Sequence, residues 1–393
     1  MNKFFTIAAI LAFALTCQFA EAAKKRYITP EEVHQTVSAA QLRKADELYE
    51  SVKTDYSRGK LTADGVVDKA LYHKTWSPEL AARCLQLVAD KSNRAKAELG
   101  FLYTYFKTAY RFPNKSDEGV RLMEAAAQAG NKRAADYLGI YYNNKKDYNK
   151  SRKYFEVAGP DNIPFALTVI GEMYDKGHGY KKDRAKAREY YGRAAVLGDA
   201  SGAAKYGSAL QRQWYGKVNM PDAFFWTYLA GELGDDFSRS NLRLPIRGER
   251  YGDDVQTAFV RNSLTLGEAW NDQYGHAIQA EPIYQEGYKI GLVPRTVQAE
   301  KGDPWSLFYL GSMSYNDEFL NRQDEFVTKC YEPILSIGQL PDNAMALVYE
   351  RLGEIYRQGK GVKANPAKAA EYTRKAANLG SLAAYKIVES IPD

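Results

Sequence analysis

The feature that most restricts how this chain can fold is an internal repeat. The stretch "NPAKAAEYTRKAANLG" at 365–380 matches "DRAKAREYYGRAAVLG" at 183–198 position for position. Upstream of both stretches, a glycine after a branched aliphatic residue, then a tyrosine and then a G-x-G sequence recur at the same offsets, within 170–180 and 352–362. A repeat period of about 20–50 residues is typical of a solenoid, in which each unit packs only against its neighbours.

Weaker copies of the unit are each marked by one glycine. These marker glycines are Gly100, Gly139, Gly171, Gly207, Gly311 and Gly353. The first four lie 39, 32 and 36 residues apart, then the chain runs 104 residues to the fifth and 42 to the sixth. Because 104 residues leave room for about three units, we expect about seven to eight units, two or three of them degenerate.

Each unit predicts two antiparallel helices. The third unit carries apolar residues at helical spacing along its first helix: Ala166, Val169, Ile170, Met173 and Tyr174. Its second helix begins after Asp183, and that of the last unit after Asn365, since both side chains can accept hydrogen bonds from free backbone N–H groups. A single pair cannot bury both apolar stripes, so neighbours must stack. The sequence therefore predicts an all-α fold, an α-solenoid of stacked antiparallel helix pairs.

The glycine-flanked His178 raises the question of a phosphate-binding or metal-binding loop. In the last unit Lys360 stands at the equivalent position, while both flanking glycines recur as Gly359 and Gly361. A structural turn recurs with the repeat, whereas a catalytic loop is unique. We therefore interpret 177–179 as a turn in which glycine supplies the positive φ that ends a helix.

These landmarks resemble the Sel-one-like repeat (SLR) family, a branch of the tetratricopeptide-repeat superfamily. The family pattern A-x-x-x-L-G-x-x-Y-x-x-G-x-G-V-x-x-D-x-x-K-A-x-x-Y-Y-x-K-A-A-x-x-G is met nearly throughout at 343–380 and 166–198. It is met in part at 94–162 and 201–234, and the resemblance covers most of 93–393. The resemblance implies an α-solenoid that binds other proteins and does not imply catalysis.

The domain organisation begins with an export signal. A positive start, an apolar stretch from Phe4 to Thr16 and the A-x-A site Ala20-Glu21-Ala22 predict a signal peptide over 1–22. The residues before Cys17 do not favour a lipoprotein, so we expect cleavage after Ala22 and a periplasmic, exported bacterial protein. After it we expect an N-terminal helical cap at 23–92 and an SLR solenoid at 93–236. Divergent repeats or an insert should follow at 237–302, and C-terminal SLR units at 303–393.

Composition argues against most other classes of protein. No stretch after the export signal is long and apolar enough to span a bilayer. The net charge of +6 comes with interleaved acidic residues, and an exported protein is not expected to meet nucleic acid. No nucleophile elbow, phosphate loop or metal-ligand spacing is present, so we expect no enzyme activity, no cofactor and no metal. The histidines, His34, His73, His178 and His276, are scattered. We expect a monomer that binds a protein partner.

The divergent segment contains the candidate binding residues. Arginine and aromatic residues are enriched at binding hot spots, and here they gather where the repeat pattern lapses. The candidates are Arg239, Arg243, Arg247, Arg250, Trp270, Tyr274 and His276. The alternative is that this segment consists of two eroded repeats whose aromatic residues pack inward.

Several roles fit a solenoid binder of this kind. The first is a non-catalytic scaffold that gathers proteins of the bacterial envelope. The second, implied by resemblance to some SLR proteins, is a periplasmic immunity protein that neutralises a lipase-like effector of a type VI secretion system. Two weaker alternatives are a surface binder of host molecules and an enzyme with an unrecognised site. Fold-level resemblance does not choose among them.

Overall fold

A computed structural model describes residues 39–106, 115–217, 219–243, 293–316, 324–359 and 361–389. Within these ranges the secondary structure is helical, with no strand. The all-α fold of adjacent helix pairs predicted from the repeat is confirmed. The described residues divide into two compact units, one up to Ala129 and one from Gly130 onward. The predicted export signal at 1–22 and the residues 244–292 lie outside the described residues.

The first unit contains five described helices and one hydrophobic core. Leu80 and Leu85 are fully buried in that core together with Leu102 of the first SLR pair. Helix starts follow the sequence, since the Ser77 hydroxyl accepts a hydrogen bond from the Leu80 N–H. The helices are α3 (Ala39–Ser57), α4 (Ala63–His73), α5 (Pro78–Gln86), α6 (Asn93–Tyr105) and α7 (Ser116–Gln128).

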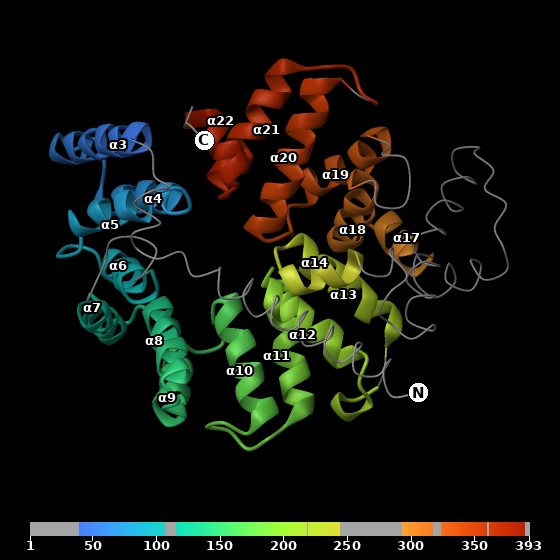
Figure 1. The fold of residues 1–393 in the computed structure, drawn as a ribbon, viewed down its shortest axis with the longest axis horizontal. Coiled ribbons are helices and arrows are strands. Elements are labelled where there is room, and N and C mark those ends of the chain that lie inside the picture. The colour runs from blue at the N-terminus through green and yellow to red at the C-terminus, as the bar shows by residue number, and fades with distance from the viewer. Residues whose placement is uncertain are drawn as a thin grey trace, which may run out of the picture. The chain divides into compact units, whose positions relative to one another are not determined.

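The second unit begins with three helix pairs followed by a short helix. The first helix of each pair carries a marker glycine near its middle, and a turn of a few residues leads into the second. Figure 1 shows these helices in green and yellow. They are α8 (Lys132–Asn144), α9 (Tyr148–Ala158), α10 (Pro164–Lys176), α11 (Arg184–Val196), α12 (Ala200–Leu210), the 3₁₀ turn η1 (Gln213–Tyr215), α13 (Met220–Glu232) and α14 (Asp236–Arg243).

After residue 292 the same unit contains two further pairs, with one more helix before them and one after them. Their apolar residues continue the core of α12 and α13, because Phe225 and Leu229 belong to one buried cluster with Phe308, Tyr331 and Leu352. The helices are α17 (Val293–Glu300), α18 (Pro304–Tyr315), α19 (Asp324–Ile337), α20 (Asp342–Gln358), α21 (Pro366–Asn378) and α22 (Leu382–Glu389).

The pair α10/α11 shows how one repeat unit is built. Asp175, near the end of α10, lies 3.4 Å from Arg184 at the start of α11. At the other end of the pair, Arg193 Nη2 donates a 2.9 Å hydrogen bond to the carbonyl of Pro160. The two helices are therefore antiparallel, as Figure 1 shows. Asp183 caps α11 by accepting from the Lys186 N–H at 3.0 Å, as the sequence predicted.

The turn of this pair confirms the interpretation of the His178 loop. Gly177 and Gly179 have φ values of 77° and 72°, and the equivalent Gly359 and Gly361 have 66° and 68°. Residues with a Cβ rarely adopt this left-handed conformation, so glycine recurs there. The ring of His178 stacks on Tyr148, with 4.1 Å between the ring centroids.

The marker glycines lie where the two helices of a pair approach most closely. A Cβ built on Gly171 would lie 2.6 Å from the ring of Tyr191 on α11, and one on Gly139 would lie 2.5 Å from the ring of Phe155 on α9. Gly311 lies under the ring of Tyr331 in the same way. In these three pairs the missing side chain therefore makes the recess that an aromatic ring of the second helix fills.

The two described cysteines are buried and unpaired, Cys84 in α5 and Cys330 in α19. Burial raises the pKa of the Cys84 thiol to about 12 and also raises that of Cys330, which leaves little reactive thiolate at neutral pH. For a chain that begins at Ala23, we expect a thiol reagent such as Ellman's reagent to modify neither cysteine in the native protein and both after denaturation. Reductant should leave the melting temperature unchanged. Two thiols blocked by a mutual bond after denaturation would contradict this.

Candidate binding surface

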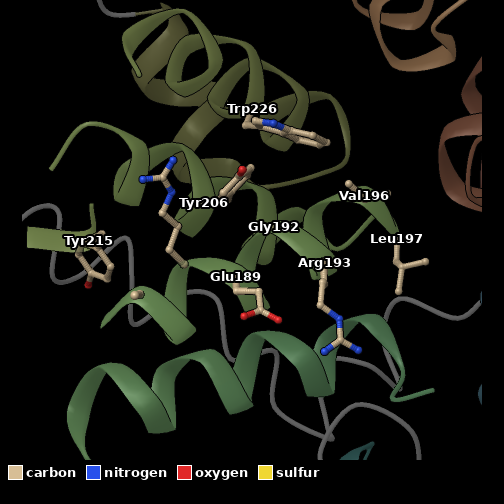
Figure 2. Close-up of a pocket in the computed structure, with 10 residues that line it drawn as sticks. Glu189, Gly192, Arg193, Val196, Leu197, Tyr206, Tyr215 and Trp226 are labelled. Atoms are coloured by element: carbon tan, nitrogen blue, oxygen red, sulfur yellow. The ribbon is translucent and has the colours of Figure 1, made fainter. Parts of the chain in front are cut away.

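A groove opens along the solvent-facing side of α11 within the second unit. Its volume is about 700 Å³, and side chains from α11, α12, η1 and α13 line it. Figure 2 shows Tyr215 at one end and Leu197 at the other, with Glu189 and Arg193 of α11 between them. We call it the α11 groove. Its lining residues are Ala185, Arg188, Glu189, Gly192, Arg193, Val196, Leu197, Tyr206, Tyr215 and Trp226.

The wall of the groove opposite α11 is a fixed aromatic pair. The rings of Tyr206 on α12 and Trp226 on α13 have centroids 5.8 Å apart. Trp226 is buried and meets Trp305 of α18 edge to face at 5.6 Å, so its position is set by the core. Gly192 lets α11 approach this wall, because a Cβ there would lie 3.2 Å from the Tyr206 ring. This wall is therefore formed before any partner binds.

Two arginines of α11 are held in the groove by backbone carbonyls. Arg188 Nη1 donates to the carbonyl of Lys217 at 2.9 Å, and Arg193 Nη2 donates to that of Pro160 at 2.9 Å. Among the residues that the structure describes, no carboxylate lies within ion-pair distance of either guanidinium. Their positions are fixed while their charges remain available to a partner.

The Tyr215 end of the groove carries an exposed tryptophan with two arginines close to its ring. Trp214 is 60% exposed, and the guanidiniums of Arg184 and Arg212 each lie 5.8 Å from its ring centroid. Cations over an aromatic face attract the ring quadrupole. The neighbouring Tyr215 is buried, and burial together with Asp175 raises the pKa of its hydroxyl to about 12. The Tyr215 hydroxyl therefore stays protonated at neutral pH.

The sequence prediction missed this cluster, although a signal for it exists. By the offsets of the third and last units, the two turn glycines of the fourth unit should stand six and eight residues after Gly207. Gln213 and Tyr215 occupy those positions, and Trp214 lies between them. An otherwise regular unit has thus replaced its glycine turn with η1, which places an aromatic residue in solvent.

The structure describes only two of the sequence-predicted binding residues. Arg239 lies in α14, where its Nε and Nη2 donate to the carbonyl of Gly231, near the end of α13, at 3.1 and 2.9 Å. Arg243 is the last residue of α14. The other five, Arg247, Arg250, Trp270, Tyr274 and His276, lie outside the described residues. The proposed role of this set stays a prediction.

Membrane-spanning helices and metal-binding clusters are both absent from the described residues. None of the described helices combines the length and the apolar character needed to cross a bilayer. In the same part of the chain, His, Cys, Asp and Glu side chains form no cluster of three or more that could hold a metal ion.

Comparison with known families identifies the repeat. The Sel1 repeat model matches five segments, at 94–131, 133–159, 164–199, 200–235 and 346–381. Each segment holds one helix pair, from α6/α7 through α12/α13 and then α20/α21. The chain is therefore a member of the Sel1-repeat (SLR) family, as its marker glycines predicted. This fold is commonly a protein-interaction scaffold and is generally non-catalytic.

Individual relatives are distant. An uncharacterized protein of Neisseria meningitidis serogroup B is 31% identical over 113 residues, which cover 28% of this chain and only 24% of that protein. A Sel1 repeat protein from Oxalobacter formigenes superposes with a TM-score of 0.30 at 19% identity, over 78% of this chain and 89% of the other. A protective antigen of uropathogenic Escherichia coli that displays an SLR fold gives 0.39 at 18% identity, over 95% and 82%.

Proposed function

We propose that this protein is a non-catalytic scaffold of the bacterial envelope that binds a protein partner through the α11 groove. The single observation that carries the proposal is the exposed Trp214, with Arg184 and Arg212 close to its ring, beside a preformed groove in a Sel1-repeat chain. Tryptophan and arginine are the residue types that most often supply the binding energy of protein interfaces. The envelope location depends on the export signal predicted at 1–22.

The form of the groove supports a protein rather than a small molecule as its partner. Val196 and Leu197 at one end and Trp214 at the other are all exposed large apolar side chains. An exposed apolar surface rimmed by charged residues is typical of an interaction site. Small-molecule sites instead bury most of their ligand in an enclosed apolar cavity, whereas the α11 groove is open to solvent.

A capture experiment with paired variants tests this function. The tagged chain from Ala23 onward is incubated with envelope extract, and retained proteins are identified for the wild type, for Trp214→Ala and for Ile387→Ala. Ile387, on α22, is another exposed large apolar residue and serves as the control. We expect a partner that wild type and Ile387→Ala retain equally and that Trp214→Ala retains at least about tenfold less strongly.

Circular dichroism checks that both variants keep the wild-type helix content and melting temperature. A partner that Trp214→Ala retains as strongly as the wild type does would exclude the α11 groove as the binding surface. The arginines of the divergent segment would then be tested next, by changing Arg243, Arg247 and Arg250 to alanine.

A further inference from the structure

Positive charge is concentrated in the segment that builds the α11 groove. Residues 181–217 contain nine lysines and arginines and three aspartates and glutamates, an excess of six positive charges. The whole chain has a formal net charge of +6. The remainder of the protein is therefore balanced overall, and the imbalance belongs to this one segment. A field of one sign along a groove attracts ligands of the opposite sign.

The acidic side chains of the segment do little to neutralise this charge at the groove. Asp183 and Asp199 are the caps of α11 and α12 and accept hydrogen bonds from the backbone N–H groups of those helices. Glu189 alone among the three lines the groove. Arg188 and Arg193 are oriented by the carbonyls of Lys217 and Pro160. Guanidiniums fixed in this way lose little conformational freedom when they meet a carboxylate.

We infer that the α11 groove binds an acidic polypeptide segment of the partner, one that also carries an aliphatic or aromatic side chain. This inference rests on the proposed function and specifies the chemistry of the partner. Carboxylates of the partner's segment lie against Arg188 and Arg212 at the Tyr215 end. Its apolar side chain packs against Val196 and Leu197 at the opposite end of the groove.

The arrangement of the groove favours a polypeptide over other anions. Arginines surround the exposed Trp214 at the Tyr215 end, and the exposed Val196 and Leu197 lie at the opposite end of the groove, so a ligand must offer charged and apolar contacts in sequence along its length. Free phosphate or sulfate could satisfy only the arginines. An anionic membrane presents a flat surface, whereas Tyr206 and Trp226 form a wall facing α11.

Selection from a randomised display library of 12-residue peptides tests the inference on the chain from Ala23 onward. We expect the selected peptides to be enriched at least about threefold in aspartate and glutamate and to contain an aliphatic or aromatic residue. The affinity of the most enriched peptide, measured by fluorescence anisotropy, should fall about tenfold or more between 0.05 and 0.5 M NaCl, since salt screens exposed charges.

Matched charge reversals locate the binding. The double variant Arg188→Glu/Arg212→Glu should lower the affinity for that peptide about tenfold or more. Arg58→Glu/Lys69→Glu changes the net charge equally at exposed residues of the first unit and should change its affinity less than twofold. Equal effects of the two variants would overturn the inference, as would peptides without acidic enrichment or no selected peptide at all.

The outcomes also separate this inference from the proposed function. If the protein binds vesicles that contain anionic lipid but binds no peptide, its ligand would be a lipid surface and the inference would be overturned. Binding of a partner that is lost in Trp214→Ala but does not change with salt or with the charge reversals would support the scaffold function. It would exclude an acidic segment as the part of the partner that binds. If acidic peptides bind in the groove but envelope extract yields no protein partner, the preference for acidic segments would be supported and the scaffold function would be excluded.

Discussion

Replacing Gly171 with alanine should destabilise the second unit by about 1–3 kcal/mol, whereas the same replacement at Gly353 should leave its stability unchanged or raise it. Both glycines occupy the same position of the repeat, in the middle of α10 and α20. In an open helix, alanine is favoured over glycine by about 1 kcal/mol. The sign of each effect therefore depends on the space above the glycine.

The two sites differ in that space. A Cβ on Gly171 would lie 2.6 and 2.7 Å from two ring carbons of Tyr191 and 3.2 Å from the carbonyl oxygen of Ala187. Tyr191 is only 4% exposed, so its ring cannot move into solvent. At Gly353 the residue equivalent to Tyr191 is Thr373, whose hydroxyl oxygen would lie 3.2 Å from the new Cβ, and the next nearest atoms would lie 3.4 Å away. A shift of a few tenths of an ångström relieves that contact.

Urea denaturation followed by circular dichroism measures both effects in the same chain. Gly353→Ala is the matched control, because it makes the same chemical change at the equivalent position. A double-mutant cycle gives a second check: in a Tyr191→Thr background the penalty of Gly171→Ala should largely disappear, although Tyr191→Thr is itself destabilising. Similar losses of stability for both alanine variants would show that close helix approach is not what selects glycine at this position.

The repeat made most of the helix pairs predictable because the same physical constraints recur in every unit. Marker glycines are required wherever a ring from the second helix fills the recess, and cap residues such as Asp183 recur at the start of many of the described helices. One sequence therefore supplied several independent examples of each constraint. The prediction of paired helices with glycine turns succeeded for this reason.

The α11 groove was not predictable in the same way. It depends on residues that depart from the repeat, such as Trp214, and on an approach between α11 and Tyr206 that no spacing rule describes. The sequence instead drew attention to a cluster of arginines near residue 243, where the pattern lapses. Proximity along the chain is a weak guide to proximity in space when the segment does not follow the repeat.

Contacts between helix pairs that are far apart in the sequence could not be predicted either. The buried Arg351 is the main example. Its Nη2 donates to Glu232 Oε2 at 2.6 Å, from α20 to α13, across 119 residues of sequence. Its Nη1 donates to the hydroxyls of Ser312 and Tyr331, each at 2.7 Å. These bonds tie α13, α18, α19 and α20 together. In the single repeat unit, Arg351 is simply one polar residue in a helix.

Arg351 remains charged in the folded protein. Burial by itself lowers the pKa of Arg351, but Tyr331 and Glu232 more than offset this and raise it above its ordinary value. The side chains of Arg351 and Glu232 are only 10% and 12% exposed. Removing one partner therefore leaves the other as an uncompensated charge in the core, which typically costs about 3–5 kcal/mol.

We accordingly expect Arg351→Met to destabilise the second unit by about 3–5 kcal/mol. Arg357→Met, at an exposed arginine of the same helix, should change stability by less than about 0.5 kcal/mol. Urea denaturation followed by circular dichroism compares the two variants with the wild type.

The double variant Arg351→Met/Glu232→Gln tests whether the loss of stability comes from the carboxylate of Glu232, which Arg351→Met leaves buried without its partner. The Glu232→Gln replacement removes the charge but keeps nearly the same side-chain shape. It also keeps the ability to accept from Asn316, whose Nδ2 donates to Glu232 Oε1 at 2.7 Å in the wild type. If an uncompensated carboxylate is the main cost, the double variant should be more stable than Arg351→Met alone. A double variant as unstable as the single one would assign the cost instead to the hydroxyls of Ser312 and Tyr331, which lose the same donor in both proteins.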